Sequence, residues 1–217
     1  RNFENVVLGF FYMKSKWEVE RSGLSDNPFK HIDTMENYQI EIMIFPQNDE
    51  LEAYVDSSMN VNGFVSNVSS IAASTDHFAF FSNEADEDAI VRWTSLLAIM
   101  DGKLFPALPL KVAAAAMERD IVVFFNEIGV ESISLVSRED DSDSIDIPVD
   151  FYGNSRFLIN HRGPGYETFA QISLADAYND TFSDKAKGFL KDSILLVGAT
   201  ATGTNDQRPS PFDPALN

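Results

Sequence analysis

The chain has 217 residues, of which 44% are hydrophobic, and a net charge of −18 from 34 acidic and 16 basic residues. The apolar content predicts a globular protein with a sizeable core, and the charge excludes nucleic acid and anionic lipid surfaces as partners. The chain has no cysteine, which excludes disulfides, zinc–thiolate sites and thiol nucleophiles.

Two strands are expected in the first third of the chain. Residues 6–12 (VVLGFFY) form a continuous apolar run, which is typical of a strand buried on both faces. Residues 38–45 carry isoleucine at every second position, which predicts an edge strand. No internal repeat and no Pro/Ser/Gly linker divides the chain, so we predict a single domain.

A hairpin followed by a helix is expected in the middle of the chain. Residues 68–73 predict a short helix and residues 77–81 a strand. Residues 89–100 predict a long strand that ends at Asp101-Gly102, a dipeptide typical of a tight turn. Residues 108–119 give the strongest helix signal, with two prolines near the start and four consecutive alanines.

An acidic tip lies between two further predicted strands. After a strand at 121–125, residues 132–136 and 145–149 flank a run with four aspartates between positions 139 and 146. One interpretation is a calcium loop, but the glycine and the terminal glutamate of an EF-hand are missing. We favour the other interpretation, an exposed and solvated hairpin loop.

The last third of the chain predicts a strand at 156–160, a sharp turn at 162–165 and a helix from Ser173 through Tyr178. Residues 194–197 (ILLV) are again fully apolar, which predicts a buried strand pairing in parallel with residues 6–12. Together these elements predict an α/β fold with a mixed central sheet, flanking helices and an antiparallel hairpin.

The loop after residues 194–197 has the glycine spacing of a phosphate-binding P-loop, with Gly198 and Gly203. A Walker motif needs lysine after its second glycine, and Thr204 stands there instead, which disfavours nucleotide hydrolysis. The loop could bind a ligand through backbone amides and threonine hydroxyls, because α/β folds place ligands at the carboxyl ends of strands. It could equally be a structural crossover whose threonines bond to their own backbone.

Other residues give weaker signals for chemistry. There is no Gly-x-Ser-x-Gly elbow, and the three histidines show no metal-ligand spacing. Arg92 lies in an apolar run and Arg162 precedes Gly-Pro. Each would need an acidic partner if buried, with Asp206 and Asp88 as candidates. Exposed phenylalanines could form a homotypic interface, but Phe10, Phe78, Phe80 and Phe81 are better explained as core.

The most specific motifs are NHRGP at 160–164, ILLVGATA at 194–201, Asp206 and SPF at 210–212. Their order resembles the CHASE2 family of extracytoplasmic sensor domains from bacterial adenylate/guanylate cyclases, histidine kinases and serine/threonine kinases. These motifs are similar to the family's Asn-Tyr-Arg-Gly-Pro, its strand into Gly-Ala-Thr-Ala-x-Gly, its Asp and its Thr-Pro-Phe.

Three upstream motifs add to the resemblance: NVVLG at 5–9, DEDAIVR at 86–92 and LPLKVA at 108–113. The chain departs from the family pattern where His161 replaces Tyr, Ala89 replaces Gly and Ser210 replaces Thr. Alanine disfavours the positive φ that glycine permits, so the turn at Ala89 could differ. His161 could either make the domain sensitive to pH or take the place of an aromatic ring.

The resemblance implies a sensory input domain between membrane helices that regulates a cytoplasmic output domain, an adenylate or guanylate cyclase in the first place. We expect the chain, residues 1–217, to lack the family's opening strand and helix and its membrane-spanning flanks. A periplasmic or extracellular location, an unidentified signal and a homodimer formed through the full-length receptor are expected, with no cofactor, no metal and no catalysis in the domain. The alternative is a phosphate- or nucleotide-handling enzyme built on the loop from Gly198 to Asp206.

The resemblance also selects residues for a ligand-binding or structural site. The candidates come from the two most specific motifs and the aspartate that follows them. They are Asn160, His161, Arg162, Gly163, Gly198, Thr200, Gly203 and Asp206.

Overall fold

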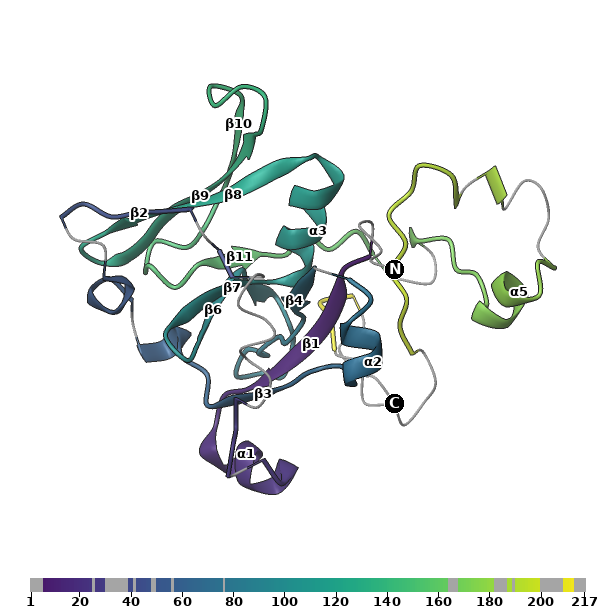
Figure 1. Ribbon diagram of the computed structural model, residues 1–217, viewed down its shortest axis with the longest axis horizontal. Coiled ribbons are helices and arrows are strands. Elements are labelled where there is room, and N and C mark those ends of the chain that lie inside the picture. The colour runs from purple at the N-terminus through teal and green to yellow at the C-terminus, as the bar shows by residue number, and fades with distance from the viewer. Residues whose placement is uncertain are drawn as a thin grey trace. The chain divides into compact units, whose positions relative to one another are not determined.

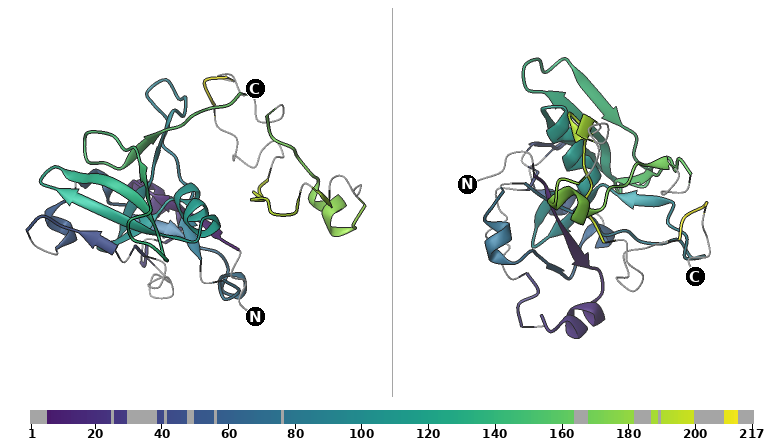
Figure 2. Two further views of the ribbon diagram at one scale, coloured as in Figure 1. Left: turned by 90° about the horizontal axis from the view of Figure 1, so that it is seen from above. Right: turned by 90° about the vertical axis from the view of Figure 1, so that its right-hand side faces the viewer.

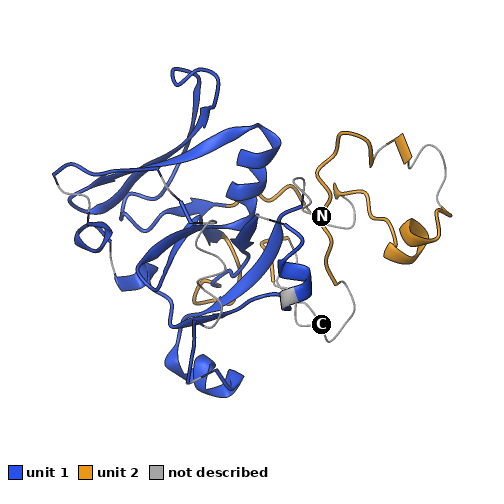
Figure 3. Ribbon diagram, in the orientation of Figure 1, with its two compact units in different colours: residues 1–84, 93–158 blue, residues 85–92, 159–217 orange. Residues whose placement is uncertain are grey.

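The computed structural model describes residues 6–24, 26–29, 39–40, 42–47, 50–55, 57–75, 77–163, 168–181, 187–188, 190–199 and 209–212. The chain forms two compact units (Figure 3): unit 1 contains Arg1–Glu84 and Trp93–Leu158, and unit 2 contains Ala85–Arg92 and Ile159–Asn217. The predicted α/β class is confirmed, because helices and both parallel and antiparallel strand pairs are present.

Figure 1 labels the helices and strands. The strands are β1 (Leu8–Met13), β2 (Ile42–Ile44), β3 (Gly63–Val65), β4 (Phe78–Phe80), β5 (Trp93–Ser95), β6 (Leu97–Met100), β7 (Lys103–Pro106), β8 (Arg119–Asn126), β9 (Gly129–Ser137), β10 (Ser144–Ile147) and β11 (Arg156–Leu158). The helices are α1 (Lys16–Ser22), α2 (Ser69–Ala72), α3 (Leu108–Ala116) and α5 (Leu174–Tyr178), and the 3-10 turns are η2 (Leu51–Ala53) and η3 (Ser57–Met59).

β1 is the central strand of a three-stranded sheet with the order β3-β1-β4. It pairs antiparallel with β3 and parallel with β4. The strand predicted at residues 6–12 is therefore confirmed, with its ends shifted toward the C-terminus. Its expected burial on both faces is wrong, because Phe11 is 44% exposed. Because both edges of β1 are occupied, the expected pairing of residues 194–197 with this strand is wrong.

A second sheet has the order β10-β9-β8-β2. β8, β9 and β10 form an antiparallel meander, and β2 pairs in parallel with β8 at the edge. The predicted edge strand and the strands on both sides of the acidic tip are thus confirmed. The tip is a hairpin closed by Arg119, whose guanidinium donates to Asp143 Oδ2 over 2.6 Å.

The turn at Asp101-Gly102 joins β6 to β7, as predicted. Both residues have positive φ, 51° and 73°, as a type I′ hairpin turn requires. The single long strand predicted for residues 89–100 is wrong, because β5 and β6 belong to different sheets. Leu96 separates them, and its amide donates to Ser155 O instead of a strand partner (2.9 Å).

The core of unit 1 consists of two clusters of buried side chains. One cluster is aromatic and contains Phe10, whose ring contacts those of Phe64 and Phe105 edge-on at 5.7 and 6.4 Å. The other lies beneath the second sheet and includes Val123 and Ile133. Helix α3 contacts both β8 and β4, so it packs against strands of both sheets (Figure 1, Figure 2).

Phenylalanines predicted to be core residues are confirmed with one exception. Phe10, Phe78 and Phe80 are at most 2% exposed, whereas Phe81 is 45% exposed. The ring of Phe81 lies over Gly9, where an added Cβ would come within 2.7 Å of it. Glycine at position 9 therefore leaves room for an aromatic side chain on the surface of the sheet.

The buried strand predicted at residues 194–197 is wrong. The four side chains are between 59% and 82% exposed, and these residues adopt no regular secondary structure. The helix predicted from Ser173 is confirmed as α5, but the Ser173 side chain makes no capping hydrogen bond. None of the helices in the described part of the chain has the length and apolar character needed to cross a membrane.

Replacing Phe105 with alanine tests the aromatic cluster. Phe105 is fully buried, so the Phe105→Ala variant is expected to lose about 3–5 kcal/mol of unfolding free energy. Met117→Ala is the control, because Met117 is 52% exposed and should change stability by less than about 0.5 kcal/mol. Urea denaturation followed by circular dichroism measures both, and equal losses in the two variants would contradict this core.

Candidate functional site

Unit 2 brings together the segments that carry the most specific motifs. It contains Ala85–Arg92 and everything from Ile159 onward. Of the eight candidate residues, Asn160, His161, Arg162, Gly163 and Gly198 are described, whereas Thr200, Gly203 and Asp206 lie outside the described residues.

The segment from Asp86 to Arg92 begins with a tight turn. The amide of Ala89 donates to Asp86 O (2.9 Å), and the amide of Asp86 donates to Ile90 O (3.0 Å). Ala89 has a φ of 65°, in the left-handed region that favours glycine. The alanine thus keeps the backbone geometry that a glycine would adopt, so the expected change of turn does not occur.

Two aspartates hold the Arg92 guanidinium. Asp88 binds it in a bidentate manner, with N–O distances of 2.9 and 2.7 Å, and Asp86 Oδ2 accepts from Nη1 at 2.9 Å. The predicted Asp88–Arg92 pair is confirmed, and the second predicted partner, Asp206, lies outside the described residues. Asp86 was not predicted as a partner, although its place in the same turn, two residues before Asp88, was a usable signal.

These ion pairs shift the pKa values of both partners. Hydrogen bonds from the Arg92 side chain, and then from the Ile90 amide, lower the pKa of Asp88 to about 2. Hydrogen bonds to Asp88 and Asp86 raise the pKa of Arg92 above its usual value. Asp88 and Arg92 therefore stay charged at any neutral or mildly acidic pH. Together with Asp86 they are called here the Arg92 clamp.

Three separate chain segments meet at Val91 and Arg92. The Val91 amide donates to Pro209 O (3.1 Å), and the Val91 carbonyl accepts from the His161 ring at Nε2 (3.0 Å). The Arg92 carbonyl accepts from the Ile159 amide (2.9 Å). We call these five residues the Val91 junction.

The contact made by His161 shows what its ring does in the folded chain. A backbone carbonyl only accepts, so the ring nitrogen that faces Val91 must carry a hydrogen. His161 therefore serves as a hydrogen-bond donor to Val91.

Four other candidates are described, and two of them flank His161 in the chain. These two, Asn160 and Arg162, are exposed, and among the described residues the Arg162 guanidinium makes no hydrogen bond or ion pair. Gly163 has a φ of 122°, which explains the glycine there. A Cβ added to Gly198 would meet no atom within 4 Å.

The acidic tip, residues 139–146, is fully described. Its Asp140 Oδ1 accepts hydrogen bonds from the Ser142 amide and hydroxyl at 2.9 and 2.6 Å. The hydrogen bond from the Ser142 hydroxyl, followed by that from its amide, lowers the pKa of Asp140. No group of three potential metal ligands occurs within the described ranges.

Comparison with protein families identifies the chain. The family model described as the CHASE2 domain matches residues 14–217. The chain belongs to the CHASE2 family. CHASE2 domains are extracellular sensory domains of signalling receptors, so the resemblance found from the sequence motifs is confirmed.

The remaining comparisons gave no match. Neither a curated protein nor a solved structure is similar to this CHASE2 domain at a significant level.

Substituting Ala89 tests the strain in the turn. Glycine has no Cβ and so removes the steric conflict that alanine has at positive φ. This gain is partly offset because glycine makes the unfolded chain more flexible. Ala89→Gly should therefore stabilise the turn by about 0.5–1 kcal/mol. Ala85→Gly is the matched control and should destabilise slightly, because Ala85 has no positive φ. Amide exchange of Ile90 and Val91 measures the effect, and faster exchange in Ala89→Gly would contradict the strained turn.

A pH titration tests the Arg92 clamp. The pKa of Asp88 is lowered from 3.8 to about 2 in the folded state. The ionised Asp88 carboxylate therefore stabilises the folded state fully at pH values above 3.8, and this stabilisation is lost as the pH falls through about 2. Carbon-13 NMR of the Asp88 carboxyl should show this midpoint in the wild type and a midpoint nearer 3.8 in Arg92→Gln. The same midpoint in both proteins would show that Arg92 is not the cause.

Proposed function

We propose that this CHASE2 domain is the sensory input domain of a transmembrane receptor and that it regulates an adenylate or guanylate cyclase on the cytoplasmic side. The observation that supports this most strongly is the family match over residues 14–217. The same proposal places the domain outside the cytoplasm, between membrane helices, with an unidentified signal and a homodimer formed through the full-length receptor.

The Val91 junction supports a mechanism for transmitting the signal. A stimulus shifts an equilibrium only if it binds two arrangements of the domain with different affinity, and about 1–3 kcal/mol is typical of such coupling. The junction holds three segments that are far apart in sequence through hydrogen bonds to the backbone of Val91 and Arg92. Movement of Val91 would therefore be passed to the segments at His161 and Pro209 together.

The domain is proposed to perform no catalysis. The charged side chains beside the junction are already paired, because Asp86 and Asp88 both bind the Arg92 guanidinium. The alternative of a phosphate-handling enzyme required a buried strand before Gly198, because such loops need the fixed end of a sheet. The exposed and irregular course of residues 194–197 removes that support.

Cyclase assays on the full-length receptor in membranes test the proposal. Arg92→Gln and Asp88→Asn are expected to change the basal production of cyclic nucleotide by about 3–10-fold, because both loosen the junction and shift the signalling equilibrium by about 1 kcal/mol. Arg138→Gln is the control, since it breaks an exposed ion pair with Asp120 (2.9 Å) within unit 1 that involves no residue of the junction.

Two results would contradict the proposal. One is unchanged output in both junction variants while the domain remains folded. The other concerns reporter fusions placed after residue 212. If alkaline phosphatase is inactive there and a cytoplasmic reporter is active, the domain lies inside the cell.

A further inference from the structure

Three large apolar side chains are exposed on two neighbouring loops of unit 1. Ile128, in the turn between β8 and β9, is 60% exposed. Phe151 and Tyr152, in the loop between β10 and β11, are 86% and 73% exposed, and their rings contact each other at 6.3 Å. Exposed apolar groups gathered in this way are typical of interaction sites rather than of ordinary surface.

The two loops are joined through their backbones. The Val130 amide donates to Gly153 O (3.0 Å). A Cβ added to Gly129 would lie 2.7 Å from the same oxygen, and one added to Gly153 would lie 2.8 Å from Ile128 O. Both glycines also have positive φ, 147° and 75°. This close approach allows only glycine on either side and fixes the position of one loop against the other.

Each loop is also closed at its own base. Asn126 Oδ1 accepts from the amides of Ile128 and Gly129 (2.8 and 3.2 Å), which holds the turn of the hairpin. Asp150 and Arg156 exchange two hydrogen bonds across the second loop: the Asp150 amide donates to Arg156 O, and the Arg156 amide donates to Asp150 Oδ1. The exposed side chains are therefore held on a preorganised backbone, which lowers the entropy cost of binding.

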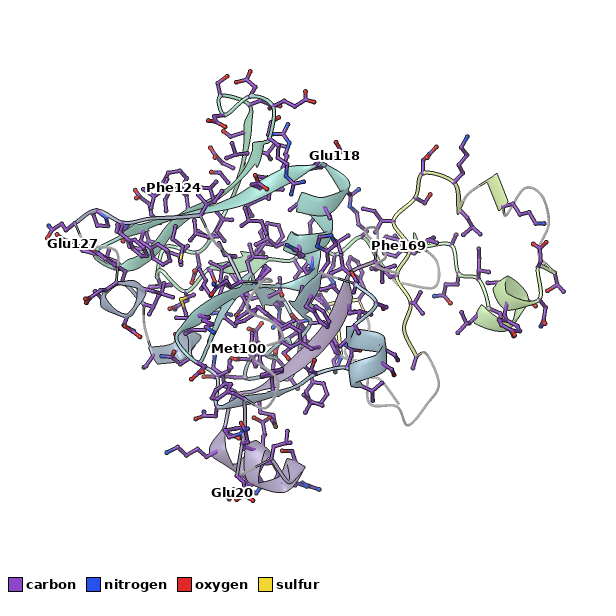
Figure 4. The ribbon with its side chains drawn as sticks, viewed as in Figure 1. Glu20, Met100, Glu118, Phe124, Glu127 and Phe169 are labelled. Carbon is purple, nitrogen blue, oxygen red and sulfur yellow. The ribbon has the colours of Figure 1, made fainter. Side chains whose placement is uncertain are left out.

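Two exposed glutamates lie on the same hairpin as Ile128. Glu127 lies in the turn between β8 and β9. Glu131 lies at a β-bulge in β9, between Val130, which pairs with Phe125, and Ser132, which pairs with Phe124. Both glutamates are exposed. Within the part of the chain that the structure describes, neither carboxylate forms an ion pair. Figure 4 shows Glu127 at the turn end of the β8–β9 hairpin. Residues 126–131 and 150–155 contain no lysine or arginine.

We propose that Glu127, Ile128, Glu131, Phe151 and Tyr152, called here the aromatic tip, form a docking site for a protein segment that carries apolar side chains next to lysine or arginine. Charge complementarity selects this partner. A second copy of the chain would bring the same glutamates against each other, and anionic lipid would be repelled by them. The inference concerns unit 1 and is independent of the function proposed above.

Binding of synthetic peptides tests the aromatic tip. The probe is a fluorescent 18-residue amphipathic peptide of leucine and lysine, compared with the same peptide carrying glutamate in place of lysine. Anisotropy should show that the wild type binds the lysine peptide and not the glutamate peptide. Phe151→Ser/Tyr152→Ser should weaken binding at least tenfold, because exposed aromatic anchors dominate such interfaces.

A charge variant and a matched control complete the design. Glu127→Lys/Glu131→Lys should also weaken binding at least tenfold, and added salt should weaken wild-type binding. Trp17→Ser removes an aromatic side chain that is 61% exposed on α1 and should change the dissociation constant less than twofold. Circular dichroism checks that each variant is folded.

Three outcomes would overturn the proposal. The first is equal binding of the lysine peptide by the wild type and the Phe151→Ser/Tyr152→Ser variant, or no binding by the wild type. The second is a concentration-dependent dimer in sedimentation that only the aromatic double variant abolishes, which would make a second copy the occupant. The third is tip-dependent binding to phosphatidylcholine vesicles, which would make the occupant a membrane.

Discussion

The backbone of Val91 makes the interaction on which the architecture of unit 2 depends. Its amide and its carbonyl bind Pro209 and His161, which lie in segments more than 45 residues apart in the chain. The next residue, Arg92, is fixed by two carboxylates, and charge-assisted bidentate pairs are among the stronger hydrogen bonds. The side-chain clamp thus orients the backbone groups that hold the other segments.

The two units differ in what stabilises them. Unit 1 has two buried clusters of aromatic and aliphatic side chains, a three-stranded sheet, a four-stranded sheet and two sheets of two strands each. In the described part of unit 2, residues 168–181 and 190–199 bury almost no side chain, and Leu196 is 82% exposed. Regions with few buried apolar contacts open at low free-energy cost, and the elements that move in signalling come from such regions.

Local patterns in the sequence predicted the fold where a short stretch contained the whole signal. The apolar run of β1, the Asp101-Gly102 turn and the strands around the acidic tip needed no long-range information. Helix α1 was missed although Ser15 and Glu18 form a capping box that the sequence displays. The failure at residues 194–197 was different, because a strand needs a partner, and the edges of β1 are taken by β3 and β4.

At the candidate site, charge predicted the Asp88–Arg92 pair, but no residue pattern showed that the His161 ring would bond to a backbone carbonyl 70 positions away.

Hydrogen exchange in the Arg92→Gln variant is the most direct measurement of whether the clamp holds the junction. The Val91 and Ile159 amides donate to the two backbone bonds that join the segments. If Arg92 orients this backbone, both amides should exchange faster by a similar factor of about 10 or more, which corresponds to about 1.4 kcal/mol, while amides in β8 and β9 stay protected. Unchanged exchange at Val91 and Ile159, or a uniform loss of protection across both units, would contradict the role of the clamp.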